Sequence, residues 1–154
     1  MGDVTTSEGR VVKHCHLHHA PCKPFELSAE QVERARDKAH NFNPDAIELS
    51  EPTRRYNCHG FSFAVSHGWF NYPDRFFEDD YDRVELSEAQ IGDVVIYMNG
   101  ETLMHSAPIA RVEGSDITEL HSKWGELALL SHSLTGVPAH YGEPVFALRL
   151  RIGP

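Results

Sequence analysis

Three consecutive segments in the second half of the sequence alternate between strand-forming residues and tight turns, and this pattern constrains the fold most. The segment "DVVIYM" (93–98) precedes Asn99-Gly100, the dipeptide most typical of a two-residue β-hairpin. The chain then returns through "ETLMHSAPIARV", turns at "EGSD" and returns again through "ITELHSKW". With a final strand in "PVFALRLRI", we expect an antiparallel meander of about four strands within a sheet of about four to six.

Two helices are expected before this sheet. Ser28 is a favourable N-cap, and Gln31 completes a capping box, so a helix is predicted over 28–40. Its apolar stripe is narrow and consists of Val32, Ala35 and Ala39. Asn57 is a second favourable N-cap, and "CHGFSFAVSHG" has apolar residues at helical spacing. We therefore expect a short, mostly buried helix over 58–67.

The order of these elements predicts an α+β domain with N-terminal helices packed on an antiparallel sheet. Residues 25–154 are expected to form this single domain, and 1–24 a flexible arm rich in His and Cys. The stretch 69–85 has no clear period and is interpreted as an irregular connection. A second capping box, Ser87 to Gln90, predicts one helical turn before the sheet.

Charge and hydropathy exclude two classes of partner. The formal net charge is −9 at pH 7 and the chain lacks a basic cluster, which argues against nucleic acid. No apolar run reaches the length of a membrane span, so no membrane partner is expected. The N-terminus lacks the features of a secretory signal, and three cysteines do not make a disulfide framework. We expect a cytoplasmic protein, with leaderless export left open.

Cys58 is the candidate nucleophile. A free thiol is mostly protonated at neutral pH, but a helix N-terminus or a neighbouring imidazole lowers its pKa. Asn57 and the helix after it would place Cys58 at a helix N-terminus. His105 is the best candidate for the neighbouring imidazole, because a titratable residue among the apolar residues of a strand is unusual without a functional role. The alternative is that Cys58 is a small apolar residue of the core.

A third group normally orients such an imidazole by accepting from its other nitrogen. His121 and Ser122 lie on the next strand, and the register decides which of them lies beside His105. Two other histidines are expected to have different roles. His59 should lie on the surface of its helix, and His132 should hydrogen-bond a turn.

The order of a Cys at a helix start, a "GDVVIY" strand, a His-bearing strand and a strand with a polar third residue resembles the papain-like NlpC/P60 and CHAP-type cysteine hydrolases. The segments "YNCHGFSFA", "MHSAPIA", "SKWG" and "HSLTGVPAHYG" also resemble a family of small bacterial domains with NC, H-A, SK-x-G and YG patterns. The resemblance covers roughly residues 50–150.

This resemblance implies a peptidase or amidase that cleaves an amide or isopeptide bond of a peptide or protein substrate and requires no cofactor. Cys58 would be the nucleophile, His105 the general base, and His121 or Ser122 the third group. The backbone N–H of Cys58, with the side chain of Asn57 or Tyr56, would stabilise the oxyanion. Lys123 and Trp124 would support the site or line its cleft.

A second cluster leads to a different reading of the protein. The segment "HCHLHHAPC" offers ligands that suit zinc, although their spacing matches no closed zinc motif; they are His14, Cys15, His16, His18, His19 and Cys22. The chain would then be a non-enzymatic binding module. A Cys-dependent transferase or deamidase would use the same Cys–His pair. A nucleophilic Cys58 is expected to react with iodoacetamide well below pH 8.

Overall fold

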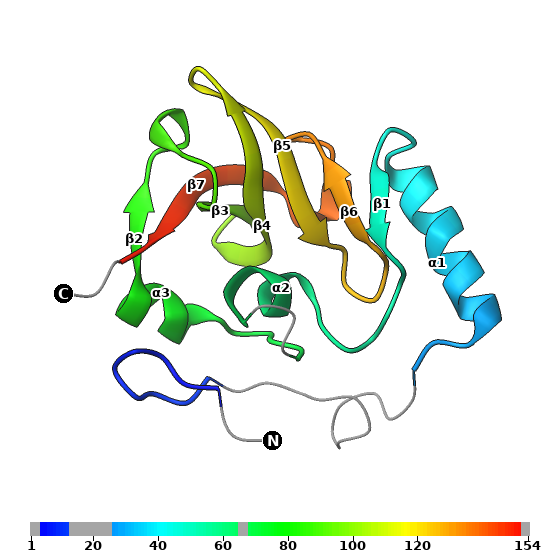
Figure 1. Cartoon of the computed structure of the whole chain (residues 1–154), viewed down its shortest axis with the longest axis horizontal. Helices are drawn as coiled ribbons and strands as arrows, with labels where there is room; N and C mark the ends of the chain where they lie inside the picture. The colour runs from blue at the N-terminus through cyan, green and yellow to red at the C-terminus, as the bar shows by residue number, and fades with distance from the viewer. Residues whose placement is uncertain (1–3, 13–25, 65–67, 152–154) are drawn as a thin grey trace.

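The computed structural model describes residues 4–12, 26–64 and 68–151. Its centre is a sheet of seven strands in the order β1-β6-β5-β4-β3-β7-β2, shown in Figure 1. Every neighbouring pair of these strands is antiparallel. The predicted α+β class is therefore confirmed, although the sheet is wider than the four to six strands expected.

The predicted meander forms the middle of this sheet. β3 (Val94–Asn99), β4 (Thr102–Glu113) and β5 (Asp116–Lys123) follow one another, and β7 (Glu143–Leu150) pairs with the other side of β3. The hairpin forms where it was predicted, with its turn one residue later: Asn99 pairs with Thr102, so Gly100 and Glu101 are the turn residues, and Gly100 adopts a φ of 64°.

Three short strands were not expected from the sequence. They are β1 (Ile47–Ser50), β2 (Tyr81–Val84) and β6 (Leu129–His132). β1 and β2 lie at the two edges of the sheet, and all four residues of β1 are exposed. The two edge strands carry little hydrophobic alternation, because they bury few side chains and depend on backbone pairing with a neighbour.

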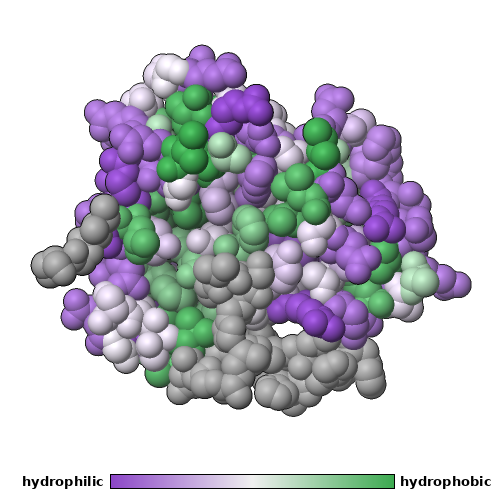
Figure 2. Space-filling view, in the orientation of Figure 1, coloured by the Kyte–Doolittle hydropathy of each residue, from purple (hydrophilic) through white to green (hydrophobic). Residues whose placement is uncertain are grey.

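Helix α1 (Ala29–Phe42) begins as predicted. The Ser28 hydroxyl accepts from the Gln31 N–H, and the Gln31 side chain accepts in return from the Ser28 N–H. Ala35 and Ala39 are buried against the segment that contains Trp124 and Leu130. The outer face of α1 is charged, and this side of the molecule is mostly hydrophilic in Figure 2.

Two shorter helices follow. α2 (Cys58–Ala64) begins where it was predicted, and the rest of the predicted helix, 65–67, lies outside the described residues. α3 (Asp74–Asp80) lies within the stretch that was interpreted as irregular. The helical turn predicted before the sheet forms, as a 3-10 turn at Leu86–Glu88. Its capping box was wrong, because no side chain caps this turn and the Gln90 N–H donates to Asp93 instead.

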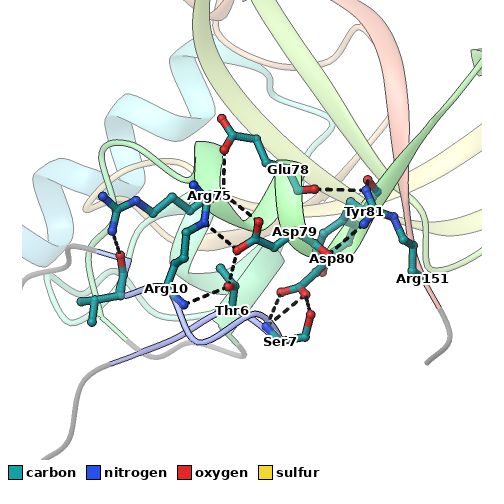
Figure 3. Close-up of polar contacts among 10 residues, drawn as sticks. Thr6, Ser7, Arg10, Arg75, Glu78, Asp79, Asp80, Tyr81 and Arg151 are labelled. Atoms are coloured by element: carbon teal, nitrogen blue, oxygen red, sulfur yellow. Dashed lines mark hydrogen bonds and ion pairs between the residues drawn. The ribbon is translucent and has the colours of Figure 1, made fainter. Parts of the chain in front are cut away.

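The described part of the N-terminal arm packs against α3, in contrast to the flexible arm expected for 1–24. Arg10 donates through two nitrogens to the Asp79 carboxylate, and Thr6 donates to the same group at 2.5 Å, as Figure 3 shows. Val12 is 1% exposed and lies in a cluster with Phe70 and Phe76. Residues 4–12 are therefore part of the folded domain.

The sheet opens between β4 and β5 at one end. Within the described residues, their pairing runs from Glu113–Asp116 to Ile109–Leu120 and stops there. Beyond this point β4 pairs only with β3, and β5 only with β6. Helix α2 lies across this end of the two strands (Figure 1). Among the described helices, none combines the length and the apolar character needed to cross a membrane.

Candidate active site

Cys58 is the first residue of α2 and is only 7% exposed. The preceding residue, Asn57, holds this helix start in place. Its Oδ1 accepts from the N–H of Gly60 at 3.0 Å and of Phe70 at 3.1 Å, and its Nδ2 donates to the Phe70 carbonyl at 2.7 Å. The predicted N-cap is confirmed. Because both polar atoms of this amide hydrogen-bond the backbone, Asn57 fixes the start of the helix and with it the position of Cys58.

The Cys58 sulfur lies among hydrogen-bond donors. The backbone N–H and the hydroxyl of Ser106, the N–H of His59 and the charge of Lys123 all favour the thiolate. Burial acts in the opposite direction and is the larger effect, so it raises the pKa of Cys58 to about 11. This direction is opposite to the lowered pKa expected from a helix start and a neighbouring imidazole, and it favours the thiol. Reaction with iodoacetamide well below pH 8 stays a prediction.

His105 is fully buried on β4, and neither ring nitrogen has a hydrogen-bond partner among the described residues. Its ring stacks on Tyr141, with centroids 4.1 Å apart and planes 9° apart, and Tyr97 lies on the same side of the sheet. Burial, together with nearby histidines, holds the pKa of His105 well below its ordinary value. The imidazole is therefore neutral, with one nitrogen free to accept a proton.

His105 and Cys58 are related through two intermediate residues, Ser106 and Tyr141, and not by a direct hydrogen bond. Ser106, next to His105 on β4, hydrogen-bonds the sulfur, through its backbone N–H and then its hydroxyl. Tyr141, which stacks on His105, has its pKa raised by burial and then by the Cys58 charge, so it also lies near the sulfur. No hydrogen bond joins Cys58 to His105 within the part of the chain that the structure describes.

Ser106 connects Cys58 to a second histidine. The Nδ1 atom of His59 lies 2.8 Å from the Ser106 Oγ, and the Ser62 Oγ lies 2.9 Å from the same oxygen. His59 is 4% exposed, so the expectation of a surface position was wrong. Burial lowers the pKa of His59 to about 4, and this imidazole is also neutral at pH 7.

Lys123 is a fully buried cation on β5. Its ammonium donates to the carbonyl oxygens of Thr53, at 2.7 Å, and Gly125, and lies 5.0 Å from the centre of the Tyr56 ring. Burial lowers the pKa of Lys123 to about 7, while the nearby Cys58 acts to raise it. Lys123 therefore brings a positive charge close to the sulfur, beyond the supporting role expected for it.

Ser122, one of the two candidates for the third group, is hydrogen-bonded to His132 and Trp124. His132 donates from Nδ1 to the Ser133 carbonyl at 2.7 Å, so its Nε2 accepts from the Ser122 hydroxyl at 2.6 Å. The Trp124 indole N–H donates to the same hydroxyl at 3.1 Å. The Ser122 hydroxyl thus uses its one hydrogen on His132, and His132 makes the turn contact expected of it.

His121 points away from this network. It lies next to Ser122 on β5, is partly exposed and contacts the Glu119 carboxylate at 2.7 Å. His132, whose charge would lower the pKa of His105, lies nearer to His105. Neither His121 nor Ser122 hydrogen-bonds His105, because the ring nitrogens of His105 have no partner among the described residues.

The six candidate zinc ligands at 14–22 lie outside the described residues. Within the described ranges, no group of three or more His, Cys, Asp or Glu residues is arranged to hold a metal ion.

Sequence reasoning missed Ser106, His59 and His132 as parts of the site. The "HS" of "MHSAPIA" was a usable signal, because a second polar residue in an otherwise apolar strand also needs a partner. The burial of His59 was less accessible, since it depends on α2 lying across β4. The end of the β4–β5 pairing, which α2 lies across, depends on strand register and has no signal in the local sequence.

Comparisons with known proteins identify a family. No curated protein and no solved structure matches the chain. One family model, described as a domain of unknown function (DUF7689), matches residues 47–149, which include every described residue of the site. The chain therefore belongs to the DUF7689 family.

Proposed function

We propose that the protein is a cysteine hydrolase of amide or isopeptide bonds, in which Cys58 is the nucleophile and His105 the general base. The observation that carries this proposal is the buried His105 imidazole, which has no hydrogen-bond partner among the described residues. A buried polar group without a partner costs about 1–3 kcal/mol, and such groups collect at functional sites.

The surroundings of the sulfur also support a nucleophile. A structural cysteine of the core is expected among apolar side chains, whereas Cys58 has donors from Ser106 and His59 and the Lys123 ammonium nearby. These groups stabilise negative charge, which develops on sulfur and then on the carbonyl oxygen during acyl transfer. The order of Cys58 and His105 in the NlpC/P60-like resemblance is a further support.

The proposed reaction starts from a neutral thiol and a neutral imidazole. As the Cys58 sulfur attacks the carbonyl carbon, its proton passes to His105. The imidazolium then protonates the leaving amine, and the C–N bond breaks to leave a thioester on Cys58. Water, deprotonated by His105, hydrolyses this thioester and restores the thiol. A transferase would follow the same steps with an amine in place of water.

Hydrolysis of p-nitrophenyl acetate, a general acyl donor, tests this proposal. We expect release of nitrophenol faster than in the matched variant Cys58→Ser, and a loss of about 100-fold or more in His105→Gln, as is typical for removal of a general base. His59→Gln is the matched control, because it also removes a buried neutral imidazole but one that is held by Ser106.

Three outcomes are informative. Loss of hydrolysis in His105→Gln but not in His59→Gln supports the assignment. The reverse pattern would move the base to His59, acting through the Ser106 hydroxyl, and would contradict the role of His105. Equal rates in wild type and Cys58→Ser would remove the enzyme proposal, and zinc binding by 1–24 would then be the function to test.

A further inference from the structure

We infer that a pocket between α1 and the β5–β6 connection is a substrate subsite for an acidic side chain next to the scissile bond. The pocket has a volume of about 360 Å³. This size is within the range of about 300–1,000 Å³ of small-ligand sites. The inference rests on the proposed function, because that function places the reacting carbonyl at Cys58.

The floor of the pocket is formed by buried apolar side chains. It is lined by Ala35 of α1, by Trp124 and Leu127, and by Tyr141. The first three residues belong to one buried cluster, against which Tyr141 packs. Phe42 at the end of α1 contacts Trp124 edge-on, with ring centroids 6.5 Å apart. Such a floor accommodates the aliphatic or aromatic part of a peptide.

The rim carries positive charge. Arg34 and Lys38 lie four residues apart on α1, on the same face as Ala35. The one acidic residue of the lining, Glu126, is paired with Arg54 at 2.9 Å. Arg34 has a long contact of 4.0 Å with Glu30, between two largely exposed side chains, which contributes little. The rim is therefore locally cationic in a chain of formal charge −9, and it complements a carboxylate.

The pocket adjoins the proposed active site through two residues. Tyr141 lines the pocket and also stacks on His105. Gly125 lines it as well, and its carbonyl accepts from Lys123, the cation near Cys58. A peptide bound here would therefore place its neighbouring residues close to Cys58. The larger pocket, of about 580 Å³, contains the acidic Asp45 and Glu119 in its lining and lacks this complementarity.

The test is a binding measurement that does not depend on turnover. Calorimetric titration of the Cys58→Ala chain compares two acetylated and amidated peptides, Ala-Glu-Phe-Ala and Ala-Gln-Phe-Ala, which differ only in one charge. Two largely exposed ion pairs correspond to about fivefold tighter binding of the Glu peptide. We expect this difference to disappear in Arg34→Gln combined with Lys38→Gln.

Charge reversal at the rim is the most discriminating part of the experiment. Arg34→Glu combined with Lys38→Glu should make the Lys-containing peptide Ala-Lys-Phe-Ala the tighter ligand. The matched control is Arg111→Gln, which removes an exposed cation on β4 outside the pocket and should keep the Glu preference. These are surface substitutions, and the thermal midpoint of each variant shows that it is folded.

The outcomes separate this inference from the proposed function. Equal affinity for the two peptides, or a Glu preference that survives loss of Arg34 and Lys38, overturns the acidic subsite whatever the esterase assay shows. A Glu preference that depends on these two residues, without any Cys58-dependent hydrolysis, would keep the subsite and remove the hydrolase.

Discussion

The surroundings of Cys58 and His105 favour the uncharged form of both side chains. Sequence reasoning expected a thiolate–imidazolium pair, because a helix start and a histidine were the visible features. Desolvation could not be predicted from the sequence, because it depends on how deeply the two residues are buried. At Cys58 its effect on the pKa is larger than that of the donors around the sulfur, and at His105 it is the largest effect. The candidate residues were predictable from the sequence, but their ionisation was not.

The first prediction concerns the ionisation of Cys58. The far-ultraviolet absorbance of the thiolate, measured as wild type minus Cys58→Ser, should rise with a midpoint near pH 11 in the folded protein. In urea the same difference should have its midpoint near pH 8.5, the value for an exposed thiol. A midpoint below pH 8 in the folded protein would restore the ion pair and contradict the neutral resting state.

The second prediction concerns Lys123. Its folded pKa of about 7 lies below the ordinary value of 10.5, so the unfolded chain binds more protons between these two pH values. The free energy of unfolding should therefore rise with pH, by up to about 1.4 kcal/mol per pH unit from this group. Lys123→Met should lose this rise between pH 7 and 8.5, and the exposed Lys38→Met should keep it; urea unfolding measures both.

At the scale of elements, the sequence predicts those that have a local signal. The capping box of α1, the N-cap of α2 and the Asn99-Gly100 hairpin are each set by side chains within a few residues, and all three are confirmed. β1 has no such signal, because it is held by pairing with β6, which is distant in sequence. The gap at Ile109 and Leu120 has the same origin in register.

The third prediction concerns the start of α2. Asn57→Ala removes three hydrogen bonds and leaves the Gly60 and Phe70 backbone groups without their partner. We expect a loss of about 2–4 kcal/mol in the free energy of unfolding. The exposed Asn71→Ala is the matched control and should have no measurable effect. Equal denaturation midpoints for the two variants would show that Asn57 does not hold the helix start.

At the scale of the whole molecule, the fold encloses a set of neutral histidines. Burial lowers the pKa values of His59 and His132 to about 4 and holds that of His105 well below normal. Sequence composition shows that histidines are frequent, but only the packing of α2 and the sheet separates buried from exposed ones. Acid sensitivity is therefore a property of the complete fold.

The fourth prediction follows from these histidines. Below their ordinary pKa of 6.5 the unfolded chain takes up protons that the folded chain excludes, so stability is lost as the pH falls from about 6.5 to 4.5. Each group contributes up to about 1.4 kcal/mol per pH unit. His59→Gln should reduce the slope of the unfolding free energy by one such contribution. An unchanged slope would show that His59 is protonated in the folded protein.

The measurement that tests the hydrolase proposal most directly is the intact mass of the protein during reaction with p-nitrophenyl acetate, followed by peptide mapping. In the wild type we expect one acetyl group, carried as a thioester on Cys58, which disappears once the ester has been consumed. In His105→Gln we expect this thioester to persist, because His105 is needed for its hydrolysis. Two results would contradict the central claim: no acetyl group on Cys58, or acetylation of Cys58 only after the protein has been unfolded.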